Sequence, residues 1–133
     1  MVSDAELFAA ARAVMANAHA PYSGFPVGAA VLTADGIVHT GCNVENASFP
    51  EGWCAETSAL GRMVSAGDWT APILAVAVTA TKMDRITPCG GCRQRLAEFG
   101  NAETRVILCD QNGPVETVAL KDLLPHAFDG KVL

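Results

Sequence analysis

Two short cysteine-bearing segments constrain this chain more than any other feature of its sequence. The first is Cys54-Ala55-Glu56, and the second, about thirty residues later, is Pro88-Cys89-Gly90-Gly91-Cys92. Three thiolates can hold a zinc ion and leave one coordination position open, which distinguishes a zinc site that performs chemistry from one that only stabilises a fold. The fold must therefore bring the two segments together around one metal ion.

Both segments are expected to begin helices, the first over residues 54–65 and the second from Cys89 or Gly90 to Phe99. The unsatisfied N–H groups at a helix start carry partial positive charge, which favours thiolate over thiol. A metal that lies beyond the helix end can be approached by both Cys54 and Glu56. We expect Glu56 to move protons to and from the zinc-bound water rather than to bind the metal. Zinc lowers the pKa of that water to roughly 7, so hydroxide is available at neutral pH.

A structural zinc site remains an alternative on the residues alone, with Cys42 or Cys109 as a fourth thiolate. Both of these cysteines lie in apolar, strand-like runs, which favours the interpretation that they are small buried hydrophobic residues.

Three thiolates and one Zn²⁺ carry a net negative charge, part of which Arg93, next to Cys92, could offset. The small Ala55 leaves its backbone groups free to face the pocket.

The remaining pattern predicts one domain over residues 1–133. Ser3 and Glu6 form a capping-box signature at the start of a first helix. Residues 34–36 read Ala-Asp-Gly, a hairpin signal, and residues 112–114 are expected to form a turn. Strands are expected over 27–32, 37–44, 73–79 and 105–109, and a short helix over 120–124. This order predicts a three-layer α/β/α sandwich with a mixed central sheet of about five strands.

Composition excludes several classes of function. The 133 residues carry a net charge of −5 with nine Lys and Arg, which opposes binding to long nucleic acid and favours a small-molecule substrate. No apolar run approaches the ~20 residues of a membrane span, and the acidic N-terminal segment does not resemble a signal peptide. We therefore expect a cytoplasmic protein with reduced thiols. The apolar fraction of 50% is high for a small monomer and favours an oligomer.

Taken together, these motifs resemble the small, zinc-dependent, homotetrameric cytidine deaminases over almost the whole chain. The zinc segments match the Cys₃ form of the zinc-deaminase pattern, which pairs a non-ligand Glu with Pro-Cys-x-x-Cys. The further matching segments are residues 21–30, residues 41–48 and residues 123–125 with Phe128.

The resemblance implies one Zn²⁺ per subunit, bound by Cys54, Cys89 and Cys92, with Glu56 as the catalytic residue. It also implies that Asn43 and Glu45 hold the ribose. These two residues lie two apart on an expected strand, so both would leave one face; a solvent-exposed polar strand edge is the alternative.

Aromatic residues complete the implied substrate site. By resemblance, Phe25 packs against the pyrimidine ring, with an ordinary core role as the alternative. The resemblance also implies that Ala55 lies at the substrate and that Phe49 and Phe128 close the pocket of a neighbouring subunit.

The implied reaction is hydrolytic deamination of cytidine and deoxycytidine to uridine and deoxyuridine in pyrimidine salvage, with release of ammonia. A zinc-activated hydroxide and the Glu56 proton shuttle would carry it. The alternatives are a deaminase of a related aminopyrimidine nucleoside such as a blasticidin-type antibiotic, an RNA- or DNA-editing enzyme, which the acidic composition opposes, and a non-catalytic zinc module. The chain departs from the family at Thr57, where these enzymes usually carry Arg, so what tempers the thiolate charge is open.

Overall fold

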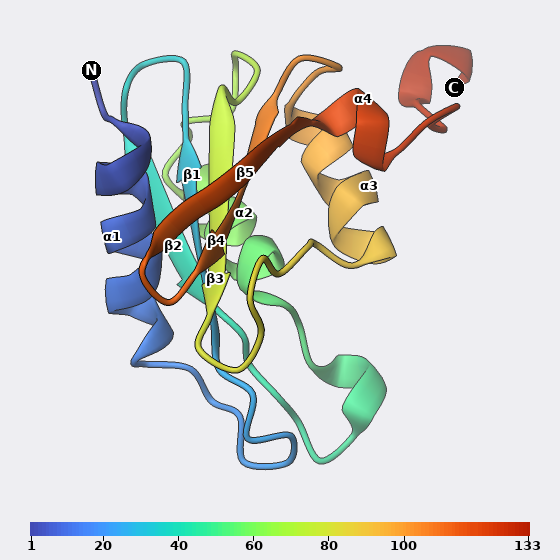
Figure 1. The fold of residues 1–133 in the computed structure, drawn as a ribbon. Coiled ribbons are helices and arrows are strands. Elements are labelled where there is room, and N and C mark those ends of the chain that lie inside the picture. The colour runs from blue at the N-terminus through green and yellow to red at the C-terminus, as the bar shows by residue number, and fades with distance from the viewer.

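A five-stranded sheet forms the centre of the protein, with strand order β2-β1-β3-β4-β5. The computed structural model describes residues 1–133, except for the side chain of Val132. The strands are β1 (Val27–Leu32), β2 (Val38–Cys42), β3 (Ala75–Ala80), β4 (Arg105–Asp110) and β5 (Gly113–Ala119). Strand β3 is parallel to β4 and the other neighbouring pairs are antiparallel, so the sheet is mixed (Figure 1).

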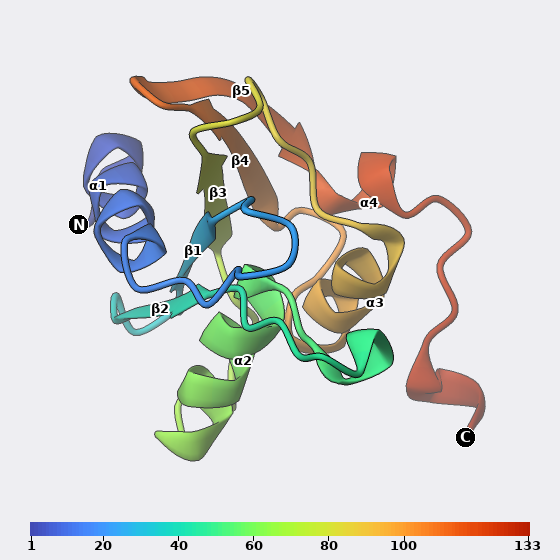
Figure 2. The ribbon, with the colours of Figure 1, turned by 90° about the horizontal axis from the view of Figure 1, so that it is seen from below.

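Helices cover both faces of this sheet. They are α1 (Asp4–Met15), α2 (Ala55–Ser65), α3 (Gly90–Phe99) and α4 (Leu120–Leu123), with 3-10 turns at Phe49–Glu51 and Gly130–Val132. Viewed from below, α1 lies on one side of the sheet and α2 and α3 lie on the other (Figure 2). This arrangement confirms the predicted three-layer α/β/α sandwich. In the described residues, no helix is long and apolar enough to cross a membrane.

The two sides of the sheet are packed with side chains of different size. On β3, the buried Val76 and Val78 belong to the hydrophobic cluster that also contains residues of α2 and α3. The alternating Ala75 and Ala77 belong to the cluster formed with α1. Gly28 on β1 also lets α1 approach closely, because a Cβ added there would lie 2.0 Å from the Ala11 carbonyl oxygen.

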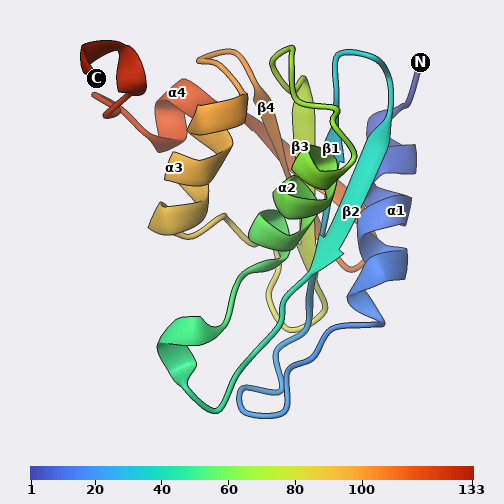
Figure 3. The ribbon, with the colours of Figure 1, turned by 180° about the vertical axis from the view of Figure 1, so that it is seen from behind.

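The opposite face of the sheet carries the two cysteine-bearing helices. The view from behind shows α2 in front of the strands, with α3 beside it (Figure 3). Helix α2 is pressed against β2 at Gly41, where an added Cβ would lie 2.2 Å from the Ala59 nitrogen. Close packing at Gly41 therefore fixes the position of the first turns of α2 relative to the sheet.

Local signals in the sequence predicted most of these elements. The capping box of α1 is present in full: the Ser3 side chain accepts from the Glu6 N–H, and the Glu6 side chain accepts from the Ser3 N–H. The predicted strand over 37–44 is shorter, since β2 ends at Cys42. Strand β5 was not predicted, because the expected turn at 112–114 includes Gly113 and Pro114, which begin it. An edge strand tolerates Pro, and most β5 residues are exposed, so β5 lacks an alternating apolar pattern.

Candidate active site

The starts of α2 and α3 bring the two cysteine segments together. Cys54 is the N-cap of α2 and Cys89 is the N-cap of α3, both with extended backbone, as an N-cap requires. Cys92 lies in the first turn of α3 and is fully buried. The three Sγ atoms all lie within 4.8 Å of one another, so the expected convergence of the two segments is present in the fold.

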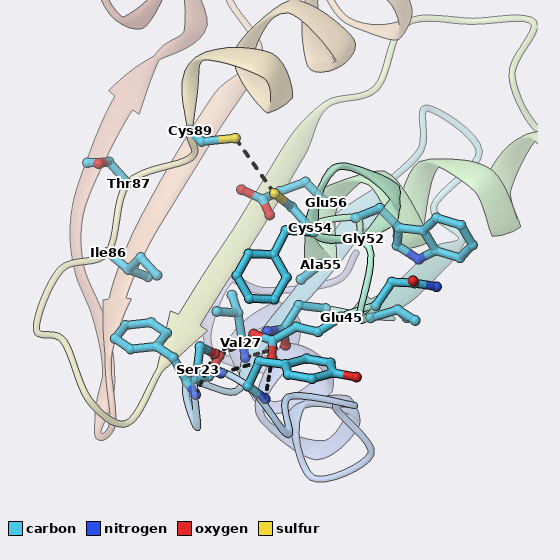
Figure 4. A pocket seen from close by; sticks show the side chains of 17 residues that line it. Ser23, Val27, Glu45, Gly52, Cys54, Ala55, Glu56, Ile86, Thr87 and Cys89 are labelled. Carbon is cyan, nitrogen blue, oxygen red and sulfur yellow. Dashed lines mark hydrogen bonds between the residues drawn. The ribbon is translucent and has the colours of Figure 1, made fainter.

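The spacing of the sulphur atoms fits a zinc ion. At a Zn–S distance of about 2.3 Å, tetrahedral geometry puts two thiolate sulphur atoms about 3.8 Å apart. The Sγ atoms of Cys54 and Cys89 are 3.7 Å apart (Figure 4). Cys54, Cys89 and Cys92 could therefore hold the metal, and this ligand set leaves a fourth position for another group.

The pKa values of Cys54 and Cys92 shift in opposite directions. The neighbouring Cys92 side chain lowers the pKa of Cys54. The neighbouring Cys54 side chain, followed by burial, raises the pKa of Cys92. Metal binding must displace the protons of the thiols that bind it.

The alternative fourth thiolates lie elsewhere in the protein. Among the described residues, the potential metal ligands that cluster here are Cys54, Cys89 and Cys92. Cys109 packs in the α1-facing cluster of the sheet, and burial raises the pKa of its thiol to about 11. Cys42, which we expected to be buried, is partly exposed at the end of β2. The geometry thus supports a three-thiolate site.

Arg93 is held by main-chain carbonyl groups. Its Nε atom donates to the Pro88 oxygen at 2.8 Å and an Nη atom donates to the Leu123 oxygen at 3.0 Å. These bonds tie the start of α3 to the end of α4. Arg93 therefore holds these two segments together. Its expected influence on the thiolate charge stays a prediction.

Glu56 is buried next to the cysteine cluster. It follows Cys54 by two residues in the first turn of α2 and is only 3% exposed. Its carboxylate lies beside the Cys54 side chain in the close-up of the pocket (Figure 4). Burial raises the pKa of this carboxyl group, and a raised pKa suits a group that accepts and returns a proton near neutral pH.

A pocket of about 590 Å³ extends from the cysteine cluster along the surface. One end is lined by Cys54, Glu56 and Cys89, while Ser23 and Glu45 line the part away from Cys89 (Figure 4). The other lining residues are Tyr22, Phe25, Val27, Asn43, Val44, Asn46, Phe49, Gly52, Trp53, Ala55, Ile86 and Thr87. Most of this lining is apolar, as is usual for a site that takes a ring-containing ligand.

Glu45 is hydrogen-bonded to the loop that precedes β1. Its Oε1 accepts from the N–H groups of Tyr22 and Ser23 at 2.9 and 3.0 Å, and its Oε2 accepts from the Ser23 hydroxyl. The Ser23 hydroxyl, followed by the Ser23 N–H, holds the pKa of the Glu45 carboxyl below its ordinary value. The carboxylate is thus fixed and ionised beside the pocket.

Asn43 holds the next part of the same loop. Its Oδ1 accepts from the Val27 N–H at 2.8 Å and its Nδ2 donates to the Phe25 oxygen at 2.9 Å. The expectation that Asn43 and Glu45 share one face of a regular strand was wrong, because β2 ends at Cys42. Both side chains nevertheless reach the pocket, since both are hydrogen-bonded to the loop before β1.

Ser23 was not recognised as a candidate site residue from the sequence. It donates to Glu45 through its hydroxyl and accepts from the Phe25 N–H at 3.0 Å. A Ser two residues before Phe25 is a local signal for such a side-chain-to-backbone turn. Its contact with Glu45 joins residues 22 apart, so no local signal predicts it.

The expected aromatic residues differ in their relation to the pocket. Phe25 lines it and is partly buried, and the fully buried Ala55 lines it next to Cys54. Phe49 also lines the pocket but is 73% exposed, and its ring lies 5.7 Å from that of Tyr22. Phe128 lies in the tail beside α3, where its carbonyl accepts from Gln94 Nε2. Among the described residues, those that line the pocket do not include Phe128.

Fold and site together define a class of protein. Three cysteines from two helix starts cluster as potential metal ligands, and a buried glutamate lies beside them without being one of the ligands. This is the arrangement of the zinc deaminases.

Comparison with known proteins leads to the same class. The family model described as the cytidine and deoxycytidylate deaminase zinc-binding region matches residues 1–109. The cytidine deaminase of Sporosarcina psychrophila is 41% identical over 92% of this chain and 89% of its own length. That of Halalkalibacterium halodurans is 43% identical over 84% of this chain and 83% of its own length.

A solved structure shows the same fold. The 1.6 Å crystal structure of cytidine deaminase from Burkholderia pseudomallei superposes with a TM-score of 0.85 at 45% identity, covering 92% of this chain and 96% of that one. The chain therefore belongs to the cytidine and deoxycytidylate deaminase family and is an enzyme of the zinc-dependent hydrolase class.

Proposed function

We propose that this enzyme hydrolyses cytidine and deoxycytidine to uridine and deoxyuridine, releasing ammonia, as a step of pyrimidine salvage. The observation that carries the proposal is the buried Glu56 beside three clustered cysteines at one end of a pocket of about 590 Å³. That volume suits a ligand with two rings, and the family of the chain favours a pyrimidine nucleoside.

Glu56 is the proton carrier of the proposed reaction. Cys54, Cys89 and Cys92 would hold a zinc ion, which would supply an activated water molecule as the nucleophile. Glu56 takes a proton from that water and delivers it to N3 of the pyrimidine ring as C4 is attacked. It then carries the second proton to the departing amino group, so that water and cytidine become uridine and ammonia. The raised pKa of Glu56 supports this double role.

The other end of the pocket holds the sugar. The ionised Glu45 carboxylate accepts a hydrogen bond from a ribose hydroxyl, and the second Nδ2 hydrogen of Asn43 donates to a hydroxyl oxygen. Phe25, held by hydrogen bonds at both its N–H and its carbonyl group, packs against the base. Ala55 lies beneath the base and presents backbone groups to it.

A homotetramer completes the pocket. Phe49 and Trp53 line the pocket yet are 73% and 51% exposed, which supports burial of this rim by another copy of the chain. Phe128, 63% exposed in the tail, would reach the pocket of a neighbouring subunit. Analytical ultracentrifugation tests this assembly, and a stable, active monomer contradicts it. A cytoplasmic location is consistent with the reduced thiols that the zinc ligands require.

Turnover of cytidine, followed by ultraviolet absorbance, tests the proposed activity. Activity should disappear with a zinc chelator and return with added Zn²⁺. A panel that includes blasticidin-type nucleosides tests the substrate, and faster turnover of such an antibiotic than of cytidine would overturn it. X-ray absorption should find three sulphur atoms and one light atom around zinc, whereas four sulphur atoms would indicate a structural site.

The variant Glu56→Gln tests the role of Glu56. We expect it to keep its zinc and lose at least about 100-fold in kcat, as general acid–base catalysis contributes ~10²–10⁴-fold. Loss of the metal in this variant would instead identify Glu56 as a ligand.

A further inference from the structure

The starts of helices α2 and α3 match at the N-cap and differ at the third helical position. Each starts after an N-cap cysteine, Cys54 on α2 and Cys89 on α3. Three residues later, at the third position of each helix, α3 carries Cys92 and α2 carries Thr57. The two helix starts face the same cluster, so these matching positions lie opposite each other. Thr57 Oγ1 is 3.7 Å from Cys92 Sγ.

The direction of this hydrogen bond is fixed by the chemistry of a zinc ligand. A thiolate has no proton to donate, so the Thr57 hydroxyl must be the donor once Cys92 binds the metal. The O···S separation is longer than that of an O–H···O bond because sulphur is the larger atom. Thr57 is partly buried, which limits competition from water.

Cys92 is the ligand that most needs a donor from the protein. It is 0% exposed, whereas Cys54 is intermediate and Cys89 is exposed, so water reaches the other two sulphur atoms more readily. A buried anion is costly unless it is hydrogen-bonded. The nearby cation Arg93 is bound to the carbonyl groups of Pro88 and Leu123.

We propose that Thr57 is a positioning residue for the metal, whose hydroxyl orients Cys92 and withdraws electron density from its thiolate. The inference rests on the zinc site of the proposed function, although not on the identity of the substrate. Groups that hydrogen-bond to metal ligands typically account for ~10–100-fold in metal affinity. Thr57 thereby supplies through a neutral hydrogen bond part of the stabilisation that three thiolates around one Zn²⁺ require.

Zinc affinity of matched variants tests this role. Thr57→Val keeps the shape of the side chain and removes the hydroxyl, while Thr57→Ser keeps the hydroxyl. By competition with a chromophoric chelator, we expect Thr57→Val to bind Zn²⁺ about tenfold more weakly and Thr57→Ser to bind it nearly as tightly as the parent. Equal affinity in all three proteins, or an equal loss in both variants, would overturn the proposal.

Cobalt substitution gives a second readout that does not depend on turnover. Removing a hydrogen bond from a thiolate raises the energy of its lone pair, so the sulphur-to-Co²⁺ charge-transfer band of Thr57→Val should move to longer wavelength, with Thr57→Ser unchanged. An unshifted band would contradict the proposed contact. If Thr57→Val melts below the parent in excess chelator, its weaker binding reflects the fold and the proposal fails. Inactivity of all proteins towards cytidine would contradict only the proposed substrate.

Discussion

The two ends of the pocket are built in opposite ways. At the metal end, the side chains come from the first turns of two helices packed on the sheet, and Cys92, Ala55 and Glu56 are all buried. At the other end, the partly buried Glu45 and the exposed Ser23 lie on two loop segments that are held by hydrogen bonds to each other. One end is fixed by packing and the other by polar contacts across the chain.

This difference separates chemistry from recognition. The metal end must hold sulphur atoms about 3.8 Å apart for tetrahedral zinc, so each thiolate is needed for the site as a whole. The other end contributes several hydrogen bonds of similar strength, each of which can be lost separately. Loss of a zinc ligand should therefore abolish metal binding and activity together, whereas substitutions at the other end should act in steps.

The largest effect is expected for Cys92→Ser. A serine hydroxyl is a much poorer zinc ligand than a thiolate, so zinc affinity should fall by more than the ~10–100-fold typical of residues that only support a ligand. Metal content after dialysis and turnover of cytidine should both be lost. Cys42→Ser is the matched control, because Cys42 lies outside the cysteine cluster, and it should keep its zinc. Full metal content in Cys92→Ser would contradict the three-thiolate assignment.

Gly41→Ala tests whether packing fixes the metal end. The added Cβ would lie 2.2 Å from the Ala59 nitrogen and 2.6 Å from the Ala55 oxygen, so α2 must move away from β2. Such overpacking costs about 1–3 kcal/mol, measured by denaturant unfolding, and zinc affinity should fall with it. Gly61→Ala, at an open position of α2, should instead stabilise the protein by about 1 kcal/mol. Unchanged stability of Gly41→Ala would show that the helix start is not held by this contact.

The same contrast explains what the sequence could predict. The metal end depends on residues close together in two helix starts, so the spacing of Cys54, Glu56, Cys89 and Cys92 was enough to predict that they converge. The other end depends on the meeting of two loops, which local patterns do not encode; the hydrogen bond between Ser23 and Glu45 spans 22 residues. Strand β5 was also missed, because most residues of this edge strand are exposed and so show no alternating apolar pattern.

Glu45→Gln tests the recognition end. The amide keeps the size of the side chain but loses the charge. Its NH₂ group would also face one of the three donors that now bind the carboxylate, which are the Tyr22 N–H, the Ser23 N–H and the Ser23 hydroxyl. Hydrogen bonds to charged groups are stronger than neutral ones, so kcat/KM for cytidine should fall about tenfold, mainly through KM. Zinc content should not change. Loss of zinc would show that the two ends are not independent.

The smallest effect is expected for Ser23→Ala, which leaves Glu45 in place and removes one of its donors. Loss of a single hydrogen bond should raise KM about fivefold with little change in kcat. The Ser23 hydroxyl is the main reason why the pKa of Glu45 lies below its ordinary value, so that pKa should rise in the variant. Ionised Glu45 would then be lost at a higher pH as the solution is acidified. The acid limb of a plot of 1/KM against pH should therefore shift towards neutral pH.

Ser65→Ala is the control for this shift, since Ser65 is an exposed residue at the end of α2, and its profile should match that of the parent. A Ser23→Ala profile with raised KM but an unmoved acid limb would mean that Ser23 acts only by holding Phe25 through the Phe25 N–H bond. In that case Glu45 would owe its ionised state to the backbone donors alone. The recognition end would then be organised by the loop backbone, and only the position of the aromatic ring would depend on the serine side chain.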